Sequence, residues 1–297
     1  MILYYIIFPI FFLLSLLPLR VLYLLSNAIY FLVYYVFGYR KEVVFKNLSI
    51  AFPEKSEQEK IKIAKEFYGL FIDTFIETIK LISISKKQFQ ARFQFDPNIL
   101  KELQKTKQSI QLHTGHFFNY EFLNLGFAIH KGTYKWLGIY SVLSNPAFNK
   151  IMYNMRSKFG TTLISSKEFR SSFHQYTNEP YLLGLAADQS TSNPLNAYWI
   201  DFFGKKTAFI KGPEKGARAM NTAVVMIYIY PKKRGYYKIE SSLLTTEPNN
   251  LPYGAITKAL ANFLEEKIKQ HPANYLWSHK RWKHEYDAEK YKDLTVN

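Results

Sequence analysis

The sequence predicts an α/β fold, in which a mixed sheet is flanked by helices, behind an N-terminal membrane-anchoring helix. Three observations lead to this prediction. β-like runs alternate with helical stretches through most of the chain, which favours helices packed on a central sheet. Two of the runs, 181–188 and 222–230, are predominantly apolar, as in strands that are buried on both faces of a sheet. The first 39 residues carry a single charged side chain, Arg20.

The N-terminal region consists of two apolar runs. Residues 1–19 are about long enough to cross a bilayer, which takes roughly 20 apolar residues. Residues 21–39 contain Ser26, Asn27 and several aromatic residues, and are more typical of a helix that lies in the interface or packs on the body. No basic residue precedes the first run and no cleavage pattern follows it, which argues against a signal peptide.

The remainder of the chain alternates between helical and β-like stretches. Ser56, followed by acidic residues, resembles a capping box, and apolar residues then recur at helical spacing up to residue 81. The β-like runs after this helix are 109–113, 133–140, 181–188 and 222–230. Further helical stretches follow the first two runs, and another precedes the segment YLWSHKRWK near the C-terminus.

The composition narrows the classes of function. A net charge of +16 indicates an anionic partner, such as nucleic acid, phospholipid headgroups or an acidic protein. The chain has no cysteine, which excludes disulfides, thiolate catalysis and cysteine-ligated metals, and its histidines lack metal-ligand spacing. The charge is scattered without an RRM, OB or helix-turn-helix pattern, which argues against nucleic-acid binding. Aromatic residues make up 18% of the chain, which fits contact with lipid.

The stretch HTGHFFNYE, 113–121, holds the candidate catalytic pair. His116 follows a predicted strand, and open α/β sheets bind ligands at the carboxyl ends of their strands. Within a regular helix His116 and Glu121 would lie about 140° apart and could not meet. If His116 lies in the turn before the helix, Glu121 can reach its Nδ1 and leave Nε2 to take a proton from a substrate hydroxyl. The alternative is a surface histidine and a first-turn glutamate that interacts with the helix dipole.

This stretch also resembles a known motif. HFFNYE is similar to the His-x4-Asp/Glu box, commonly H-F-G-N-W-E, of the bacterial lipid A biosynthesis acyltransferases, which are lauroyl and myristoyl transferases of the lysophospholipid acyltransferase-like superfamily. Other segments match in the family's order: GYRKEVVFKNLSIAFPE, MRSKFGTTLI, LAADQS, FFGKKTAFIKGPEKGARAMNTAVV and YLWSHKRWK. The resemblance covers nearly the whole chain and implies a glycerolipid acyltransferase-like fold. Phe118 replaces the usual glycine and Tyr120 the usual tryptophan, so acceptor fit or chain-length preference can differ.

The resemblance also implies roles for individual residues. His116 would be the general base and Glu121 its partner, while Asn119 would shape the turn between them. Arg156, which precedes Gly160, would bind the thioester carbonyl or a substrate phosphate and stabilise the oxyanion. The other residues that match family motifs near the substrate are Asp188, Gln189, Phe203, Gly204 and Thr207.

Structural roles are the alternatives for several of these residues. His113 is better interpreted as a structural residue at a strand end than as a second base. Asp188 could simply cap the element that follows its strand. Arg281 and Lys283 could form a solvated face, although the neighbouring tryptophans suggest an interface.

Taken together, the resemblance implies an O-acyltransferase of the bacterial inner membrane, with its body on the cytoplasmic side. It would move a fatty acyl chain from acyl carrier protein to a hydroxyl of a lipid A precursor, without metal or cofactor. Residues 1–39 would form the membrane anchor with its interfacial helix, and residues 40–297 the catalytic domain. One alternative is an acyltransferase for another acceptor, such as an amino-acid lipid, glycolipid or lysophospholipid. A more distant alternative is a membrane-anchored nucleic-acid-binding protein.

Overall fold

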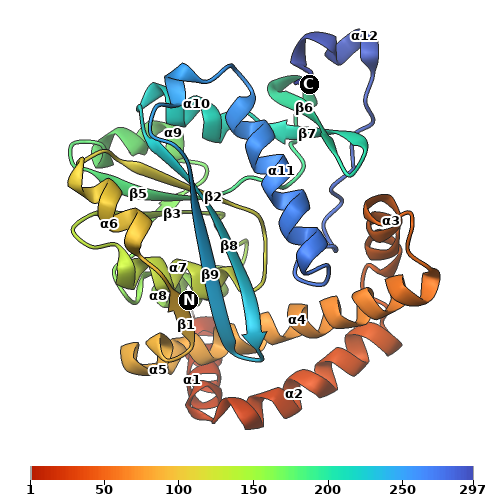
Figure 1. The fold of residues 1–297 in the computed structure, drawn as a ribbon. Helices are drawn as coiled ribbons and strands as arrows, with labels where there is room; N and C mark the ends of the chain where they lie inside the picture. Colours follow the sequence, from red (N-terminus) through yellow and green to blue (C-terminus); the bar gives the residue numbers. More distant parts are fainter. Residues whose placement is uncertain (1, 297) are drawn as a thin grey trace.

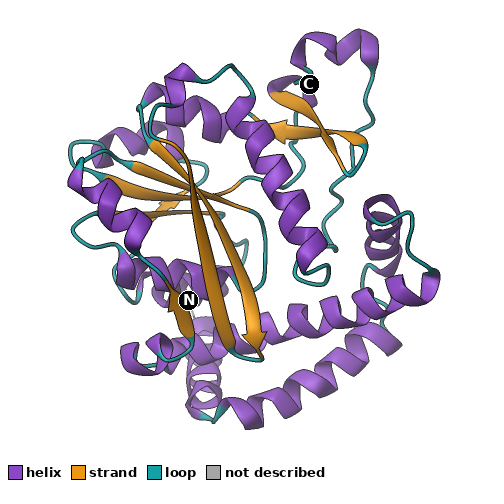
Figure 2. Ribbon diagram, viewed as in Figure 1, coloured by secondary structure: helices purple, strands orange, loops and turns teal. Residues whose placement is uncertain are grey.

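A seven-stranded mixed sheet forms the centre of the protein, and its strand order is β1-β9-β8-β2-β5-β3-β4 (Figures 1 and 2). The computed structural model describes residues 2–296. Neighbouring strands are parallel except for β8 and β9, which are antiparallel. The strands of this sheet are β1 (Phe93–Phe95), β2 (Ile110–Thr114), β3 (Lys135–Tyr140), β4 (Thr162–Ser165), β5 (Tyr181–Ala186), β8 (Ala223–Lys233) and β9 (Tyr236–Thr245). A separate antiparallel hairpin consists of β6 (Ala197–Phe202) and β7 (Lys205–Ile210).

Helices surround the sheet, and the helices of the N-terminal region extend beyond it (Figure 2). The α-helices are α1 (Ile2–Leu16), α2 (Leu19–Phe31), α3 (Lys41–Ala51), α4 (Glu57–Ser83), α5 (Lys86–Gln90), α6 (Asn98–Lys105), α7 (Tyr120–His130), α8 (Pro146–Ser157), α9 (Phe169–Ser172), α10 (Gly212–Ala219), α11 (Ala255–Gln270) and α12 (Ala288–Tyr291). The π-helical turn η1 (Leu32–Val36) continues α2, and the 3-10 turns are η2 (Phe173–Tyr176), η3 (Pro194–Asn196), η4 (Pro248–Asn250) and η5 (Lys292–Leu294).

The two faces of the sheet are covered by different helices. Leu112, Gly184 and Gly138 are in register on adjacent parallel strands and therefore share a face. Gly138 lies next to Asn124 of α7, so α7 covers that face. On the opposite face the Gln111 side chain lies next to α10, and α11 packs against β2 and β8 (Figure 1). The sequence-predicted α/β arrangement is confirmed, and the four predicted β-like runs form β2, β3, β5 and β8.

Helix α4 supports the N-terminal helices. Its predicted capping box is formed, because Ser56 Oγ accepts from the Glu59 N–H and the Glu59 carboxylate accepts from the Ser56 N–H. Helices α1 and α2 both pack along α4, and α1 also contacts α8 (Figure 1). By length and composition the helix Leu19–Val36 could cross a membrane. Helix α1 has 15 residues, fewer than the roughly 20 that a span takes, so the first apolar run is shorter as a helix than the sequence suggested.

Polar side chains attach α2 to the body of the protein. Ser26 Oγ donates to Asp73 Oδ1 at 2.5 Å, and the Tyr23 hydroxyl donates to Glu77 Oε1 at 2.7 Å. Asn27 Oδ1 accepts from Arg234 Nη2 at 2.9 Å. The polar residues that distinguish this run in the sequence therefore face α4 and the β8–β9 hairpin. This arrangement agrees with the expectation that the second run packs on the body.

Candidate active site

His116 lies in the loop between β2 and α7, at the carboxyl end of the central parallel strands. Its Nδ1 is 2.5 Å from Asp188 Oδ1, and its backbone N–H donates to Asp188 Oδ2 at 2.9 Å. Asp188 follows β5, the strand paired with β2, and the Ala187 N–H continues the pairing by donating to the Thr114 carbonyl. Gly115 permits this approach, because a Cβ there would lie 2.5 Å from Leu264 Cδ2 and 3.2 Å from Asp188 Oδ2. Two neighbouring strand ends thus bring the imidazole and the carboxylate together.

The structure corrects the expected partner of His116. The loop position of His116 is as predicted, but Nδ1 pairs with Asp188 and not with Glu121. Glu121 lies in the first turn of α7, and its carboxylate accepts from Arg156 of α8. The side chain of Glu121 therefore points toward α8, and the carboxylate from the adjacent strand occupies the Nδ1 side of the imidazole. Asp188, expected near the substrate, is the residue that orients His116.

The electrostatics of the pair favour ionised Asp188. Burial alone would raise the pKa of Asp188, but the charge of His116, its two hydrogen bonds and the more distant Arg281 outweigh it and lower the pKa to about 2. Burial lowers the pKa of His116, and the Asp188 carboxylate outweighs this and raises it. His116 Nε2 makes no hydrogen bond within residues 2–296, and the side chain is 23% exposed. The imidazole is therefore held through Nδ1, with Nε2 available to a substrate.

Glu121 and Arg156 form a second pair beside the first. Arg156 Nη2 donates to Glu121 Oε1 at 2.6 Å, and Nε lies 3.0 Å from both carboxylate oxygens. Burial opposes the charged form of Arg156, but Glu121 outweighs it and raises the pKa of the guanidinium. Nη1 donates to no residue in the described part of the chain. Tyr120 lies between the pairs, because its ring centroid is 6.1 Å from that of His116 and its phenol senses the charges of Glu121 and Arg156.

Asn119 shapes the loop by capping α7. Its Oδ1 accepts from the N–H groups of Glu121 and Phe122, at 3.0 and 3.4 Å. Its Nδ2 donates to Glu77 Oε2 at 3.2 Å, and the same carboxylate oxygen accepts from the Tyr237 hydroxyl at 2.6 Å. Burial raises the pKa of Glu77 to about 7, although these hydrogen bonds oppose the shift.

Sequence reasoning missed Glu77. The signal is visible in GLFIDTFIETIKL, in which Asp73 and Glu77 interrupt an otherwise apolar helical stretch at a spacing of one turn. Acidic residues at that spacing share one face of the helix, and here that face is buried against α2 and the β8–β9 hairpin.

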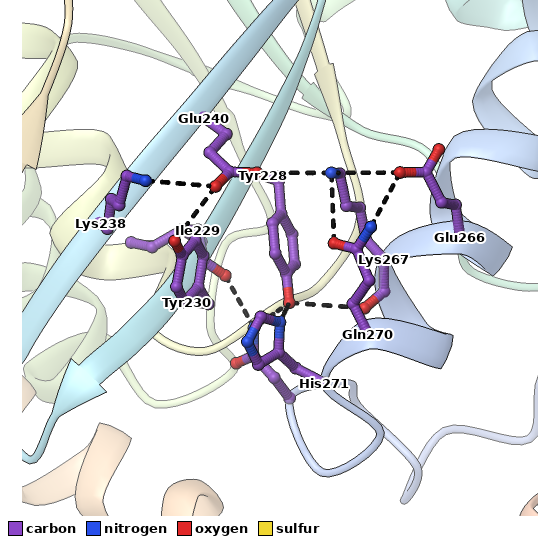
Figure 3. A network of polar contacts seen from close by, with 10 residues as sticks. Tyr228, Ile229, Tyr230, Lys238, Glu240, Glu266, Lys267, Gln270 and His271 are labelled. Carbon is purple, nitrogen blue, oxygen red and sulfur yellow. Dashed lines mark hydrogen bonds and ion pairs between the residues drawn. The ribbon is translucent and has the colours of Figure 1, made fainter.

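Asn274 holds the other side of the loop. Its Oδ1 accepts from the Phe118 N–H at 3.1 Å, and its Nδ2 donates to the Ile229 carbonyl at 2.7 Å. Figure 3 shows a polar network beside this region, in which the Tyr228 hydroxyl of β8 points to His271 after α11 and the Tyr230 hydroxyl points to Glu240 of β9. The Tyr228 hydroxyl is 2.9 Å from His271 Nδ1. The loop that carries His116 is therefore fixed from both α4 and β8.

The segment SHKRWK is mostly internal, which corrects one interpretation of the sequence. Arg281 is fully buried rather than part of a solvated face, and Nη1 donates to the Ala208 carbonyl at 3.0 Å. Its guanidinium lies 4.1 Å from the centroid of Phe209. Trp277 and Trp282 are also buried, whereas Lys283 is exposed. The tryptophans beside Arg281 therefore indicate internal packing.

Two residues of the motif GYRKEVVFKNLSIAFPE hold this segment. Asn47 Nδ2 donates to the carbonyls of Trp277 and His279, each at 2.7 Å. Arg40 Nη1 donates to the Ser278 carbonyl at 3.0 Å. His279 Nε2 in turn accepts from the Ser190 N–H, two residues after Asp188. These motif residues therefore have a structural role in supporting the Asp188 side of the site.

The remaining predicted residues are distributed over two regions. Gln189 is half-buried next to Asp188 in the chain. Phe203 and Gly204 form the turn of the β6–β7 hairpin and line a cavity of about 480 Å³ together with Phe52 and Lys269. Thr207 is buried in β7, and its hydroxyl donates to the Lys205 carbonyl. Within residues 2–296 no hydrogen bond or ion pair joins the hairpin residues to His116 or Asp188.

His113 occupies the structural position expected for it. It is buried on β2, its Nε2 lies 2.8 Å from the Gln111 amide, and burial lowers its pKa to about 4, so the ring is neutral. Within residues 2–296 no three His, Cys, Asp or Glu side chains are grouped to hold a metal ion.

The fold and this geometry define a class of α/β enzyme in which a histidine, oriented by a buried carboxylate at two strand ends, is placed to act as a base. The sequence profile of the family described as bacterial lipid A biosynthesis acyltransferase matches residues 1–284, and the chain belongs to this family. It is accordingly an acyltransferase of lipid A biosynthesis, and the family implies an acyl donor and a lipid A precursor as substrates. It is similar to "Lipid A biosynthesis acyltransferase 2" of Shigella flexneri, with 24% identity over 241 residues that cover 78% of this chain and 74% of that protein.

Proposed function

We propose that the protein transfers a fatty acyl chain from acyl carrier protein to a hydroxyl of a lipid A precursor, as a late acylation step in lipopolysaccharide biosynthesis. The reaction takes place at the cytoplasmic side of the bacterial inner membrane. Residues 1–39 form the anchor and residues 40–297 the catalytic domain. The observation that carries the proposal is the His116–Asp188 pair, in which Nε2 bonds to no residue of 2–296, in a chain of this family.

His116 is the general base of the reaction. Asp188 accepts a hydrogen bond from Nδ1–H, which fixes the tautomer in which Nε2 carries a lone pair. Nε2 takes the proton of the acceptor hydroxyl while the oxygen attacks the thioester carbonyl carbon. The C–S bond then breaks, and the imidazolium returns its proton to the leaving thiolate. Asp188 stabilises the imidazolium that exists between these two transfers, which explains why an ionised carboxylate belongs at this position.

Arg156 stabilises the negative charge that develops on the thioester oxygen. Glu121 occupies Nε and one N–H of Nη2, so the guanidinium keeps Nη1 for a substrate oxygen. Glu121 acts through Arg156 as a positioning residue, and its charge-assisted hydrogen bonds fix the plane of the guanidinium. The contribution of the Glu121–Arg156 pair is therefore electrostatic, and proton transfer belongs to His116.

The other motif residues serve the substrate side of the site. Asn119 acts by holding the loop, and Gln189 lies next to the catalytic carboxylate in the chain. Phe203, Gly204 and Thr207 belong to a hairpin whose turn lines a cavity of about 480 Å³ with mixed apolar and charged walls. We assign this hairpin to the binding of the acyl donor, because the rings of Phe52 and Phe203 in this cavity offer the apolar contact that a fatty thioester needs.

Mass spectrometry of lipid A tests the proposal. Cells that lack this chain should accumulate a lipid A species lighter by one acyl chain, and the wild-type gene should restore the heavier species. The gene with His116→Ala should fail to restore it, because loss of a general base lowers turnover by roughly 10²–10⁴. His174→Ala, which alters an exposed histidine in η2, is the matched control and should restore it. Unchanged lipid A in the deletion strain would contradict the assigned acceptor.

A further inference from the structure

A second cavity, of about 400 Å³, lies where the turn between α1 and α2 meets the end of α4 and the short helix α5. Its polar lining consists of Arg20, Lys80, Gln88 and Arg92. No acidic side chain lines it. None of its lining residues belongs to the His116 site. One of them, Arg20, is the only charged residue among residues 1–39.

The cations of this cavity lack carboxylate partners within residues 2–296. Arg20 has no hydrogen bond or ion pair in that part of the chain. Lys80 Nζ donates to the carbonyls of Ser15 and Leu17, at 2.7 and 3.0 Å, which leaves one N–H. Arg92 Nη1 donates to the Gly235 carbonyl at 3.2 Å, which leaves most of its donors. The cavity therefore presents several N–H donors and no compensating negative charge.

Three other arginines of the protein are paired with carboxylates, whereas Arg40 and Arg281 donate to backbone carbonyls. Arg156, Arg218 and Arg234 each pair with a buried carboxylate, at 2.6, 2.8 and 2.5 Å. Burial lowers the pKa of Lys80, and the charge of Arg92 lowers it further, so the cations of the cavity repel one another. Placing like charges in a concave site costs stability unless an anion is bound there.

The backbone adds donors of the same kind. Helix α2, with 13 residues, begins at Leu19 and has no side-chain cap, because its N-cap residue is Pro18. The Val21 and Leu22 N–H groups donate to the Pro18 carbonyl, so the N–H groups of Leu19 and Arg20, together with the helix dipole, favour an anion at this point. Gln88 completes the set, since its Oε1 accepts from the Ser85 N–H and its amide nitrogen stays available.

The surroundings of the cavity are apolar and exposed. Leu19 and Ile84 form part of its wall, and Leu16 and Leu17 next to it are 55% and 38% exposed. Exposed apolar side chains continue along α1 away from the cavity. A ligand with an anionic head and hydrocarbon chains would match both parts of this surface.

We propose that this cavity binds the phosphate group of a membrane lipid, with Arg20 and Arg92 as the principal donors and the acyl chains along α1. Arginine forks match the tetrahedral oxygens of phosphate, and the N–H groups of Lys80 and of the α2 terminus complete the contact. Two lipids offer this chemistry: a phospholipid of the bilayer, and the phosphorylated acceptor itself. The inference rests on the membrane location proposed above, and its test by vesicle binding is independent of the acyl transfer reaction.

Vesicle binding by the full-length protein tests the proposal. The test variant is Arg20→Gln/Arg92→Gln, and Lys80 is left in place because it holds backbone carbonyls. The matched control is Lys167→Gln/Arg170→Gln, which removes two exposed cations next to α9, on the opposite side of the molecule in Figure 1. Flotation compares phosphatidylcholine vesicles with vesicles that also contain phosphatidylglycerol or phosphatidic acid.

Each cation near an anionic surface contributes about fivefold to binding, so the test variant should lose about 25-fold on anionic vesicles and little on phosphatidylcholine. The control should lose much less. The single variant Arg20→Gln breaks no described contact and should lose about fivefold, which preserves the test if the double variant is poorly folded.

A second measurement identifies the lipid. The apparent KM for the acceptor is measured in neutral detergent micelles, where no bilayer competes. Loss of vesicle binding with an unchanged KM assigns the cavity to a bilayer phospholipid, and a raised KM with unchanged kcat assigns it to the acceptor phosphate. Equal losses in test and control variants, or no change in either measurement, would overturn the proposal. So would a selective loss of affinity for acyl carrier protein, which would make the cavity a protein-binding site. Because flotation needs no catalysis, its outcome is separate from that of the proposed function.

Discussion

Replacing Asp188 by asparagine distinguishes the two carboxylates of the site. In the wild type, Asp188 accepts two hydrogen bonds from His116: Oδ2 accepts from the backbone N–H, and Oδ1 accepts from Nδ1–H. An asparagine has one acceptor oxygen. If this oxygen keeps the backbone N–H, the NH₂ group faces Nδ1 and forces the imidazole proton onto Nε2. The base would then have no lone pair directed at the substrate.

The size of the effect follows from this geometry. Loss of the correct tautomer in a histidine–carboxylate pair costs about 10⁴ in turnover, so we expect a decrease of roughly 10³–10⁴ in kcat for Asp188→Asn. Glu121→Gln leaves the His116 tautomer intact and affects only the orientation of Arg156. Its decrease in kcat should therefore be smaller, roughly 10–10².

The pH profile gives a second, independent readout. Asp188 raises the pKa of His116 against the effect of burial, so removing the carboxylate charge lowers that pKa. The acid limb of kcat/KM reports the pKa of His116 in the free enzyme. It should therefore move to lower pH in Asp188→Asn and stay in place in Glu121→Gln. Steady-state acyl transfer to the lipid A precursor in detergent micelles measures both quantities, and circular dichroism checks that each variant is folded. The reasoning would be refuted by the opposite pattern, with a larger loss and a displaced acid limb in Glu121→Gln.

Three further predictions concern other parts of the protein. Arg156→Ala should lower kcat by roughly 10²–10³. Arg156→Lys should recover only part of this loss, because lysine keeps the charge but lacks the planar guanidinium. An unchanged kcat with a raised KM for the acceptor would instead assign Arg156 to substrate binding. Glu77 has a pKa of about 7 in the folded protein against a usual 4.5, so the fold favours its protonated form. The resulting stability is complete below pH 4.5 and is lost as pH rises through 7, which lowers the free energy of unfolding by roughly 2–4 kcal/mol. Chemical unfolding in detergent at pH 5 and pH 8 should show this loss in the wild type and a smaller one in Glu77→Gln; equal losses would contradict the burial of an ionisable Glu77. Deleting residues 1–16 should leave the protein on the membrane at low salt, because Leu19–Val36 and the basic surface remain, whereas full release into the soluble fraction would exclude that role for α2.

Much of the fold could be predicted because its signals are local. The capping box at Ser56 and the apolar runs that became β5 and β8 depend on neighbouring residues only. The strand β9 was not predicted, since YYKIESSLLT alternates polar and apolar residues as an antiparallel partner of β8, and no short-range signal announces that pairing. The hairpin β6–β7 was missed for the same reason, although its turn contains Phe203 and Gly204 at positive φ.

The sequence placed the candidate site at the end of a strand, but it did not predict which side chains of the site pair with one another. His116 could be placed in a loop after a strand from the sequence alone. Its partner could not be identified, because the contact with Asp188 spans 72 positions and depends on β2 and β5 being neighbours in the sheet. A spacing of five residues suggested Glu121, whose true partner Arg156 is 35 positions away on another helix. Strand order and helix packing therefore decide which carboxylate meets which cation.

The division of the two carboxylates also has an energetic reason. The side chains of Glu121 and Asp188 are 3% and 2% exposed, so each ionised carboxylate needs a cation in contact with it. If Glu121 paired with His116, the mostly buried guanidinium of Arg156 would lose its partner, and Asp188 would keep only the backbone N–H of His116 and the more distant Arg281. The observed pairing leaves neither carboxylate without a cation. It also separates the roles that we propose for the two cations, because a carboxylate that bound both His116 and Arg156 would pull the guanidinium toward the imidazole. In this chain the glutamate of the His-x4-Glu spacing therefore holds Arg156, and in the mechanism proposed above the proton chemistry depends on Asp188 at the end of the neighbouring strand.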